Sequence, residues 1–104
     1  MSMRYKKRYF LVEVDGVSNQ EAFERQMYST LNNIEPFLAI RSNFRVIKGL
    51  TKFDGEKARG VIVVNNEYKY RVIFSLSLIS KFYKSNLLTI MNSGNIKKIK
   101  SFKF

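Results

Sequence analysis

The chain has 104 residues, of which 19 are Lys or Arg and eight are Asp or Glu, so its formal net charge is +11. Because 45% of the residues are hydrophobic, this basic chain has enough apolar material for one packed domain over residues 1–104 and is not a disordered tail. The absence of His and Cys excludes an imidazole base, a thiol nucleophile, disulfides and the usual zinc and copper sites.

The first third of the chain predicts a strand followed by a helix. Residues 8–14 are rich in aromatic and β-branched side chains and stop at Asp15-Gly16, as a strand before a turn does. Ser18 and Glu21 fit a capping box, which predicts a helix start at Ser18. The helix carries one apolar stripe at helical spacing, made of Phe23, Met27, Leu31 and Ile34.

Pro36 and Asp54-Gly55 divide the middle of the chain. The proline disfavours helical geometry at the residue before it and suits the first turn of a short helix over residues 36–41. Strands over residues 44–53 and 58–64, joined at Asp54-Gly55, predict an antiparallel hairpin. The second of these strands is nearly all apolar, which predicts a central place in the sheet.

The last third predicts a helix, a strand and a basic terminal helix. The first helix begins near Asn65 and carries a stripe made of Tyr68, Val72, Leu76, Ile79 and Tyr83. Residues 87–91 predict a strand, and Ile96, Ile99 and Phe102 a short basic helix after it. The order of elements predicts an α+β, ferredoxin-like split βαβ sandwich, with a four-stranded antiparallel sheet, helices and a short basic C-terminal helix.

The positive charge is concentrated in two segments. Residues 4–8 contain four cations, and residues 68–104 contain eight cations and no acid. If the first and last strands are neighbours in the sheet, both segments can share one surface, which predicts a phosphate-binding footprint. There is no myristoylation start and no run of about 18 apolar residues, so we expect no membrane partner and a cytoplasmic location.

Glu13 and Asp15 are the candidate metal ligands, because residues two apart in a strand point to the same face. Two carboxylates are few for two-metal phosphodiester cleavage, and acids are common on the solvated end of a strand before a turn. We therefore assign no catalytic or metal-binding residue and no cofactor to the polypeptide. A small ferredoxin-like, metal-dependent endoribonuclease that uses Asp15 remains the enzymatic alternative.

Base stacking on the central strand is disfavoured by its sequence. The RNA-recognition motif stacks bases on aromatic side chains of its central strands, whereas Val61 to Val64 are β-branched here. We expect this sheet face to be covered by extra helices or by another subunit, since exposed valines would form an adhesive patch. The aromatic residues that fit the core stripes least, and that we expect to stack or dock, are Tyr5, Tyr70 and Phe104.

Four segments resemble the ribonuclease P protein component 2 family of archaea, which is related to a small subunit of eukaryotic nuclear ribonuclease P. The segments are residues 7–14 (KRYFLVEV), 60–64 (GVIVV), 67–79 and 93–98 (SGNIKK). Two features depart from the family pattern. Val63 and Val64 stand where the family usually has a basic residue, and Asn95 replaces the usual Thr while keeping a side chain able to cap a helix.

The resemblance implies a non-catalytic subunit of the ribonucleoprotein that removes the 5′ leader of precursor tRNA. In that family the catalytic core is RNA with bound Mg²⁺, and component 2 pairs with protein component 3, often as a homodimer within a heterotetramer. The implied partners are thus ribonuclease P RNA, precursor tRNA and component 3. A ribosomal or other ribonucleoprotein scaffold is the main alternative. The expected RNA-binding residues are Lys6, Lys7, Arg8, Arg59, Lys69, Arg71, Lys97, Lys98 and Lys100.

Overall fold

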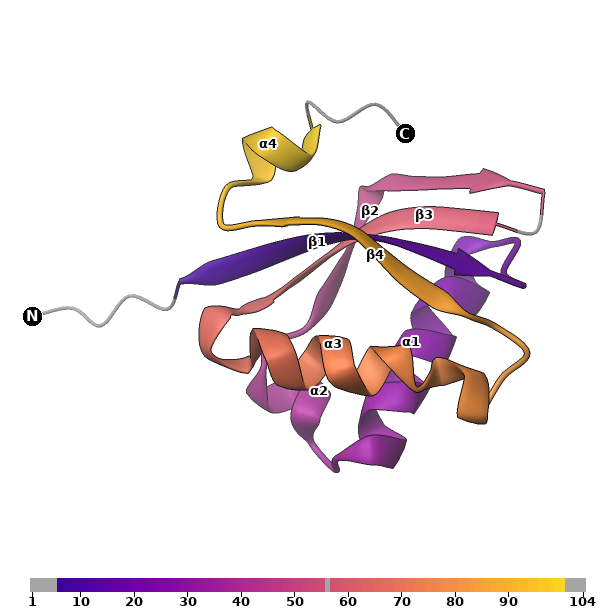
Figure 1. Cartoon of the computed structure of the whole chain (residues 1–104), viewed down its shortest axis with the longest axis horizontal. Helices are drawn as coiled ribbons and strands as arrows, with labels where there is room; N and C mark the ends of the chain where they lie inside the picture. Colours follow the sequence, from indigo (N-terminus) through magenta and orange to yellow (C-terminus); the bar gives the residue numbers. More distant parts are fainter. Residues whose placement is uncertain (1–5, 56, 101–104) are drawn as a thin grey trace, which may run out of the picture.

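The computed structural model describes residues 6–55 and 57–100 (Figure 1). Their elements, in chain order, are β1 (Lys7–Asp15), α1 (Gln20–Ile34), α2 (Leu38–Arg41), β2 (Arg45–Asp54), β3 (Lys57–Asn65), the 3-10 turn η1 (Asn66–Tyr68), α3 (Lys69–Ser77), the 3-10 turn η2 (Ile79–Lys81), β4 (Leu87–Ser93) and α4 (Ile96–Lys100).

The described strands form one antiparallel sheet in the order β2-β3-β1-β4. The prediction of an α+β fold with helices on an antiparallel sheet is confirmed, as is the central place of β3. The first and last strands pair, so the condition for a shared cationic surface is met. Figure 1 shows α1, α2 and α3 on one face of the sheet and α4 on the other. The face under α4 is called the open face below.

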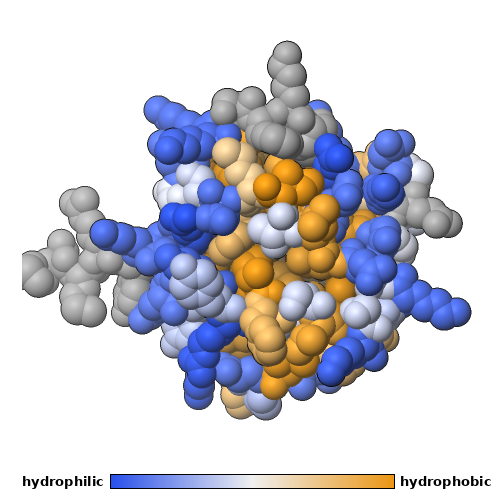
Figure 2. Space-filling model, in the orientation of Figure 1, coloured by the Kyte–Doolittle hydropathy of each residue, from blue (hydrophilic) through white to orange (hydrophobic). Residues whose placement is uncertain are grey.

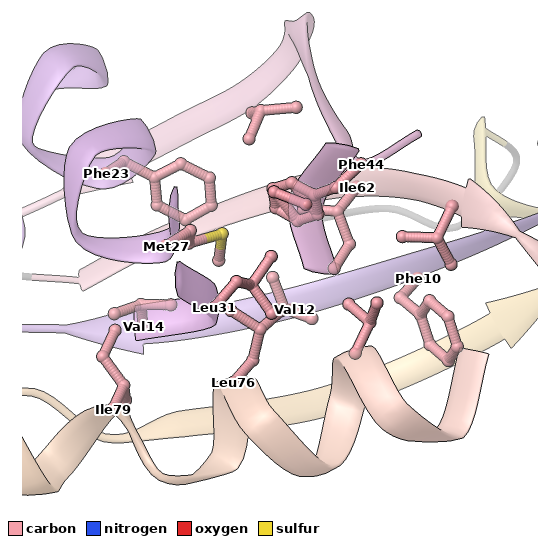
Figure 3. Packing of buried hydrophobic residues seen from close by; sticks show 14 of the residues in the cluster. Phe10, Val12, Val14, Phe23, Met27, Leu31, Phe44, Ile62, Leu76 and Ile79 are labelled. Atoms are coloured by element: carbon pink, nitrogen blue, oxygen red, sulfur yellow. The ribbon is translucent and has the colours of Figure 1, made fainter. Parts of the chain in front are cut away.

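The main core lies between the sheet and helices α1 and α3 (Figure 3). Side chains alternate between faces along a strand, so Phe10, Val12 and Val14 of β1 point toward the helices. Phe23 of α1 packs against Gly60 of β3, where an added methyl carbon would lie 2.8 Å from the Cζ atom of the ring. Gly60 is therefore required by the packing of the Phe23 ring.

The boundaries of the first two helices differ from the sequence expectation at two places. The N-cap of α1 is Asn19 and not Ser18, because the Asn19 Oδ1 atom accepts a 2.7 Å hydrogen bond from the Ala22 amide. Glu35 is extended before Pro36, as expected, but α2 begins only at Leu38, since Phe37 takes a left-handed φ of 67°.

The helix predicted from Asn65 to Tyr83 is divided into three parts. The segment begins with η1, which the Asn65 side chain does not cap. α3 then ends at Ser77, and η2 begins at Ile79. The Ser77 hydroxyl donates a 2.6 Å hydrogen bond to the Phe74 carbonyl, and a local bond of this kind competes with the helical ladder.

A second, smaller apolar cluster lies on the open face. Ile99 of α4 is fully buried against Leu11 of β1 and Val61 of β3. The expected basic terminal helix is thus present at Ile96–Lys100, and it covers part of the valine-rich face. Tyr5, Phe102 and Phe104, which the sequence assigned to stacking, docking or this helix, lie outside the described residues.

Candidate nucleic-acid interface

The beginnings of β1 and β2 meet α4 at one end of the open face. Tyr9 and Arg45 are both cross-strand partners of Val63, so the three strands place these side chains on the same face. Lys7 lies two residues before Tyr9 and shares this face. Lys7 and Arg45 are exposed, whereas Tyr9 is half-buried beside the Leu11 cluster.

These residues line a groove of about 300 Å³ between the sheet and α4. Ile47 and Val63 give it apolar surface on the sheet side, and Ile96 of α4 forms part of a wall. Lys7 and Arg45 supply positive charge at its border. The groove therefore combines an aromatic ring, an apolar floor and two cations.

Helix α4 carries three more cations toward solvent. Burial of Ile99 leaves Lys97, Lys98 and Lys100 exposed around it. Asn95 fixes the start of this helix: its Oδ1 atom accepts a 2.8 Å hydrogen bond from the Lys97 amide. We refer to Lys6, Lys7, Arg45, Lys97, Lys98 and Lys100 as the cationic end.

The start of α3 also lies near the cationic end. The amide of Asn66 donates a 2.7 Å hydrogen bond to the carbonyl of Lys6, which fixes η1 beside the residue that precedes β1. Lys69 follows directly after η1, and its Nζ atom lies 5.0 Å from the ring centre of Tyr70. Tyr70 is 79% exposed on α3, outside the groove.

Arg8 differs from its neighbours Lys6 and Lys7 because its side chain is half-buried. Its Nη2 atom donates a hydrogen bond to the Asn92 side chain on β4. Its Nε atom is buried, and it has no hydrogen-bond partner among the described residues. Arg8 thus ties β1 to β4 through its guanidinium group.

Two predicted arginines are not brought together with the cationic end. Arg59 lies near the β2-β3 hairpin, where its Nε atom is 3.0 Å from the Glu13 carboxylate. Arg71 of α3 lies on the helical side, with its Nη2 atom 3.2 Å from the Glu35 carboxylate. Each pairs with an acid, so neither adds an unneutralised charge to the open face beside α4.

Glu13 and Asp15 each engage a group of the protein. Glu13 accepts the hydrogen bond from Arg59, and the Asp15 Oδ1 atom accepts a 2.6 Å hydrogen bond from the Asn86 amide. Within residues 6–55 and 57–100, acidic side chains do not gather in a group of three or more that could hold a metal ion. This geometry gives Asp15 a structural role at the β1–β4 end of the sheet.

Sequence reasoning did not select Tyr9 and Arg45 for the site. Alternation could have found them, since Phe44 and Val46 face the core and Arg45 must then face the other side. The juxtaposition of Arg45 with Tyr9 needed the pairing register, which no local pattern supplies.

The chain matches no protein-family model and no curated protein. Among solved structures, the de novo designed protein Ferredog-Diesel aligns with 88% of this chain and 90% of its own, at 9% identity and a TM-score of 0.42. Within the described part of the chain, every helix falls short of the length and apolar character that a membrane crossing requires.

Proposed function

We propose that this chain is a non-catalytic RNA-binding subunit of a ribonucleoprotein, and that the ribonucleoprotein is ribonuclease P. The cationic end carries this proposal, since it gathers lysines and an arginine from β1, β2 and α4 on one surface beside a groove. The sequence resemblance to component 2 supplies the particular complex. The strand order β2-β3-β1-β4 supports assignment of the fold to the ferredoxin-like class.

Phosphate neutralisation is the physical basis of this function. Cations that replace condensed counterions along an RNA backbone gain affinity from counterion release and carry no sequence information. The net charge of +11 opposes compaction of the isolated protein and is offset when a polyanion binds. Catalysis then belongs to the RNA and its Mg²⁺ ions, and the polypeptide holds the RNA fold.

The pairing of the two candidate metal ligands favours this function over an endoribonuclease. Glu13 is engaged by Arg59 and Asp15 by the Asn86 amide. A metal ion bound between these carboxylates would compete with the Arg59 guanidinium for Glu13 and with the Asn86 amide for Asp15. We therefore expect the purified polypeptide to leave precursor tRNA uncut in the presence of Mg²⁺.

Purification of the tagged chain from its own cells, with sequencing of the bound RNA, tests the proposal. We expect ribonuclease P RNA, component 3 and cleavage of the precursor tRNA leader in the same fraction. Ribosomal RNA in its place would support the scaffold alternative. Mg²⁺-dependent cleavage by the isolated polypeptide, abolished by Asp15→Asn, would support the endoribonuclease.

A second copy of this chain is the protein partner that we propose for the edge of the sheet. Figure 2 shows apolar surface over β4 and α3. The exposed apolar side chains of these elements include Leu88 of β4, which is 60% exposed, and Phe74 of α3, which is 65% exposed. β4 is an edge strand, and residues 85–96 contain no charged side chain, so two highly basic copies can approach there without local repulsion. Pairing of two β4 edges would join the two sheets.

Sedimentation equilibrium tests this association. We expect the wild-type chain to dimerise and Leu88→Asp to be monomeric, because the substitution places a desolvated carboxylate at each copy of the interface. Ile40→Asp is the matched control, since Ile40 is 77% exposed on α2, away from this edge, and its variant should dimerise like the wild type. A monomeric wild type, or a dimeric Leu88→Asp variant, would show that β4 is not the dimer interface.

A further inference from the structure

We propose that the groove beside Tyr9 binds one unpaired RNA nucleotide, with its base against the Tyr9 ring and its phosphates at Lys7 and Arg45. This inference rests on the proposed RNA-binding function and deepens it, because backbone contact alone needs no aromatic residue. The sequence of β3 disfavours base stacking on the open face, whereas this inference places one base there.

The composition of the groove is the first argument. Tyr9, Ile47 and Val63 form an aromatic and apolar surface, whereas a site for phosphate alone would be lined by donors. A nucleobase presents a flat apolar face that can displace water from such a surface. The base is thus the part of RNA that matches the floor of the groove.

The position of the charges is the second argument. Lys7 lies two residues before Tyr9 on β1, and Arg45 of β2 lies on the other side of Val63, the β3 residue that pairs with both Tyr9 and Arg45. The aromatic ring is therefore bordered by cations from two strands, as a base with phosphates on either side requires. The first acid after Arg45 in β2 is Asp54, nine residues farther along the chain.

The size of the groove and the position of α4 are the third argument. A volume of about 300 Å³ is at the lower end of the range for small-ligand sites, which fits one nucleotide and not a base pair. Ile96 closes part of one side, and the buried Ile99 holds α4 in that position. Entry thus requires a base that is already free of its duplex partner.

The absence of aromatic residues from β3 does not prevent this binding. The sequence of β3 indicated that its β-branched residues exclude base stacking on the face. In the structure the aromatic ring comes from β1, and Val63 of β3 lies beside it as apolar surface. Tyr9 is the one aromatic residue among the described residues that line the groove, so base stacking on this face depends on it.

Tryptophan fluorescence provides a direct test, because the chain contains no Trp and Tyr9→Trp introduces a single reporter. The ligands are a single-stranded oligouridine RNA, an abasic strand of the same length and heparin. We expect the oligouridine to quench the new fluorophore and the abasic strand and heparin to bind without quenching. Equal fluorescence with oligouridine and with the abasic strand at saturation would overturn the proposal.

Affinity measurements separate a missing base site from a missing RNA interface. Tyr9→Leu should weaken oligouridine binding by at least about fivefold while its affinity for the abasic strand stays unchanged. Tyr9→Phe should bind as the wild type does. The matched control is Phe82→Leu, which changes an exposed aromatic residue directly after η2, outside the groove, and should leave both affinities unchanged.

The two hypotheses fail in different ways. If the wild-type chain binds the abasic strand and oligouridine equally, and Tyr9→Leu does the same, the base site is refuted and the phosphate interface remains. If the wild-type chain binds none of the three polyanions, the RNA-binding function itself is refuted. Circular dichroism of each variant confirms that the fold is retained before affinities are compared.

Discussion

Neutralising the three lysines of α4 tests whether the cationic end contacts RNA phosphates. The triple variant Lys97→Gln, Lys98→Gln and Lys100→Gln removes three of the exposed charges and keeps side chains that suit a helix. Ile99 stays in place, so the packing of α4 on Leu11 and Val61 is unchanged. We expect weaker RNA binding and a shallower dependence of affinity on salt.

The size of the effect follows from counterion release. For a single strand, each neutralised phosphate contributes about −0.7 to the slope of log affinity against log salt, so loss of three contacts makes the slope shallower by about 2.1. Between 50 and 200 mM salt, the wild type should then lose about 20-fold more affinity than the variant does. This difference is well above the error of a fluorescence anisotropy titration.

A charge-matched variant provides the control. Lys57, Lys81 and Lys84 are exposed, and they lie toward the Asp15 end of β1, away from the cationic end. Changing all three to Gln removes the same charge, so it reports the effect of net charge alone. If the α4 variant and this control show equal slopes, the cationic end is not the RNA interface.

Two further predictions concern the packing of the main core. Gly60→Ala should lower the free energy of unfolding by about 1–3 kcal/mol, because the added methyl carbon would overlap the ring of Phe23. Urea denaturation measures this change, and an unchanged free energy of unfolding would contradict the close approach of the ring to Gly60. Burial raises the pKa of Tyr28 above 10.0, so this hydroxyl contributes stability below pH 10 that is lost as the pH rises through the folded-state value. Tyr28→Phe should remove that loss of stability at alkaline pH. It should also lower the free energy of unfolding by about 1 kcal/mol near neutral pH, because the 3.1 Å hydrogen bond to the Phe44 carbonyl is lost. An unaltered pH profile of unfolding would exclude Tyr28 as the titrating group.

Local sequence signals predicted the positions of most helices and strands, but they misplaced several of the helix ends. The apolar stripe of α1 and the Glu35-Pro36 stop were readable because helical periodicity and proline geometry depend on neighbouring residues only. The choice between Ser18 and Asn19 as N-cap depends on the path by which the chain leaves β1. The interruption after Ser77 escaped detection because Ile79 and Tyr83 continue the apolar stripe across it.

The positive charge of the candidate site was predictable from the sequence, whereas several of the residues that form the site were not. The cations of β1 and α4 lie close together, as the pairing of β1 with β4 requires. Arg59 and Arg71 were expected to bind RNA, and sequence could not show that Glu13 and Glu35 lie beside them. Ion pairs between residues far apart in the chain are decided by the fold.

The sign and location of the charge, the order of strands and helices, and the absence of His and Cys chemistry can all be read from the amino-acid sequence. These properties depend on composition or on local periodicity, so they can be read without coordinates. The fold brings Tyr9, Val63 and Arg45 side by side, and the burial of Ile99 fixes a basic helix next to them. Cross-strand register and helix docking depend on contacts between distant residues, and for this reason the groove became visible only in the folded chain.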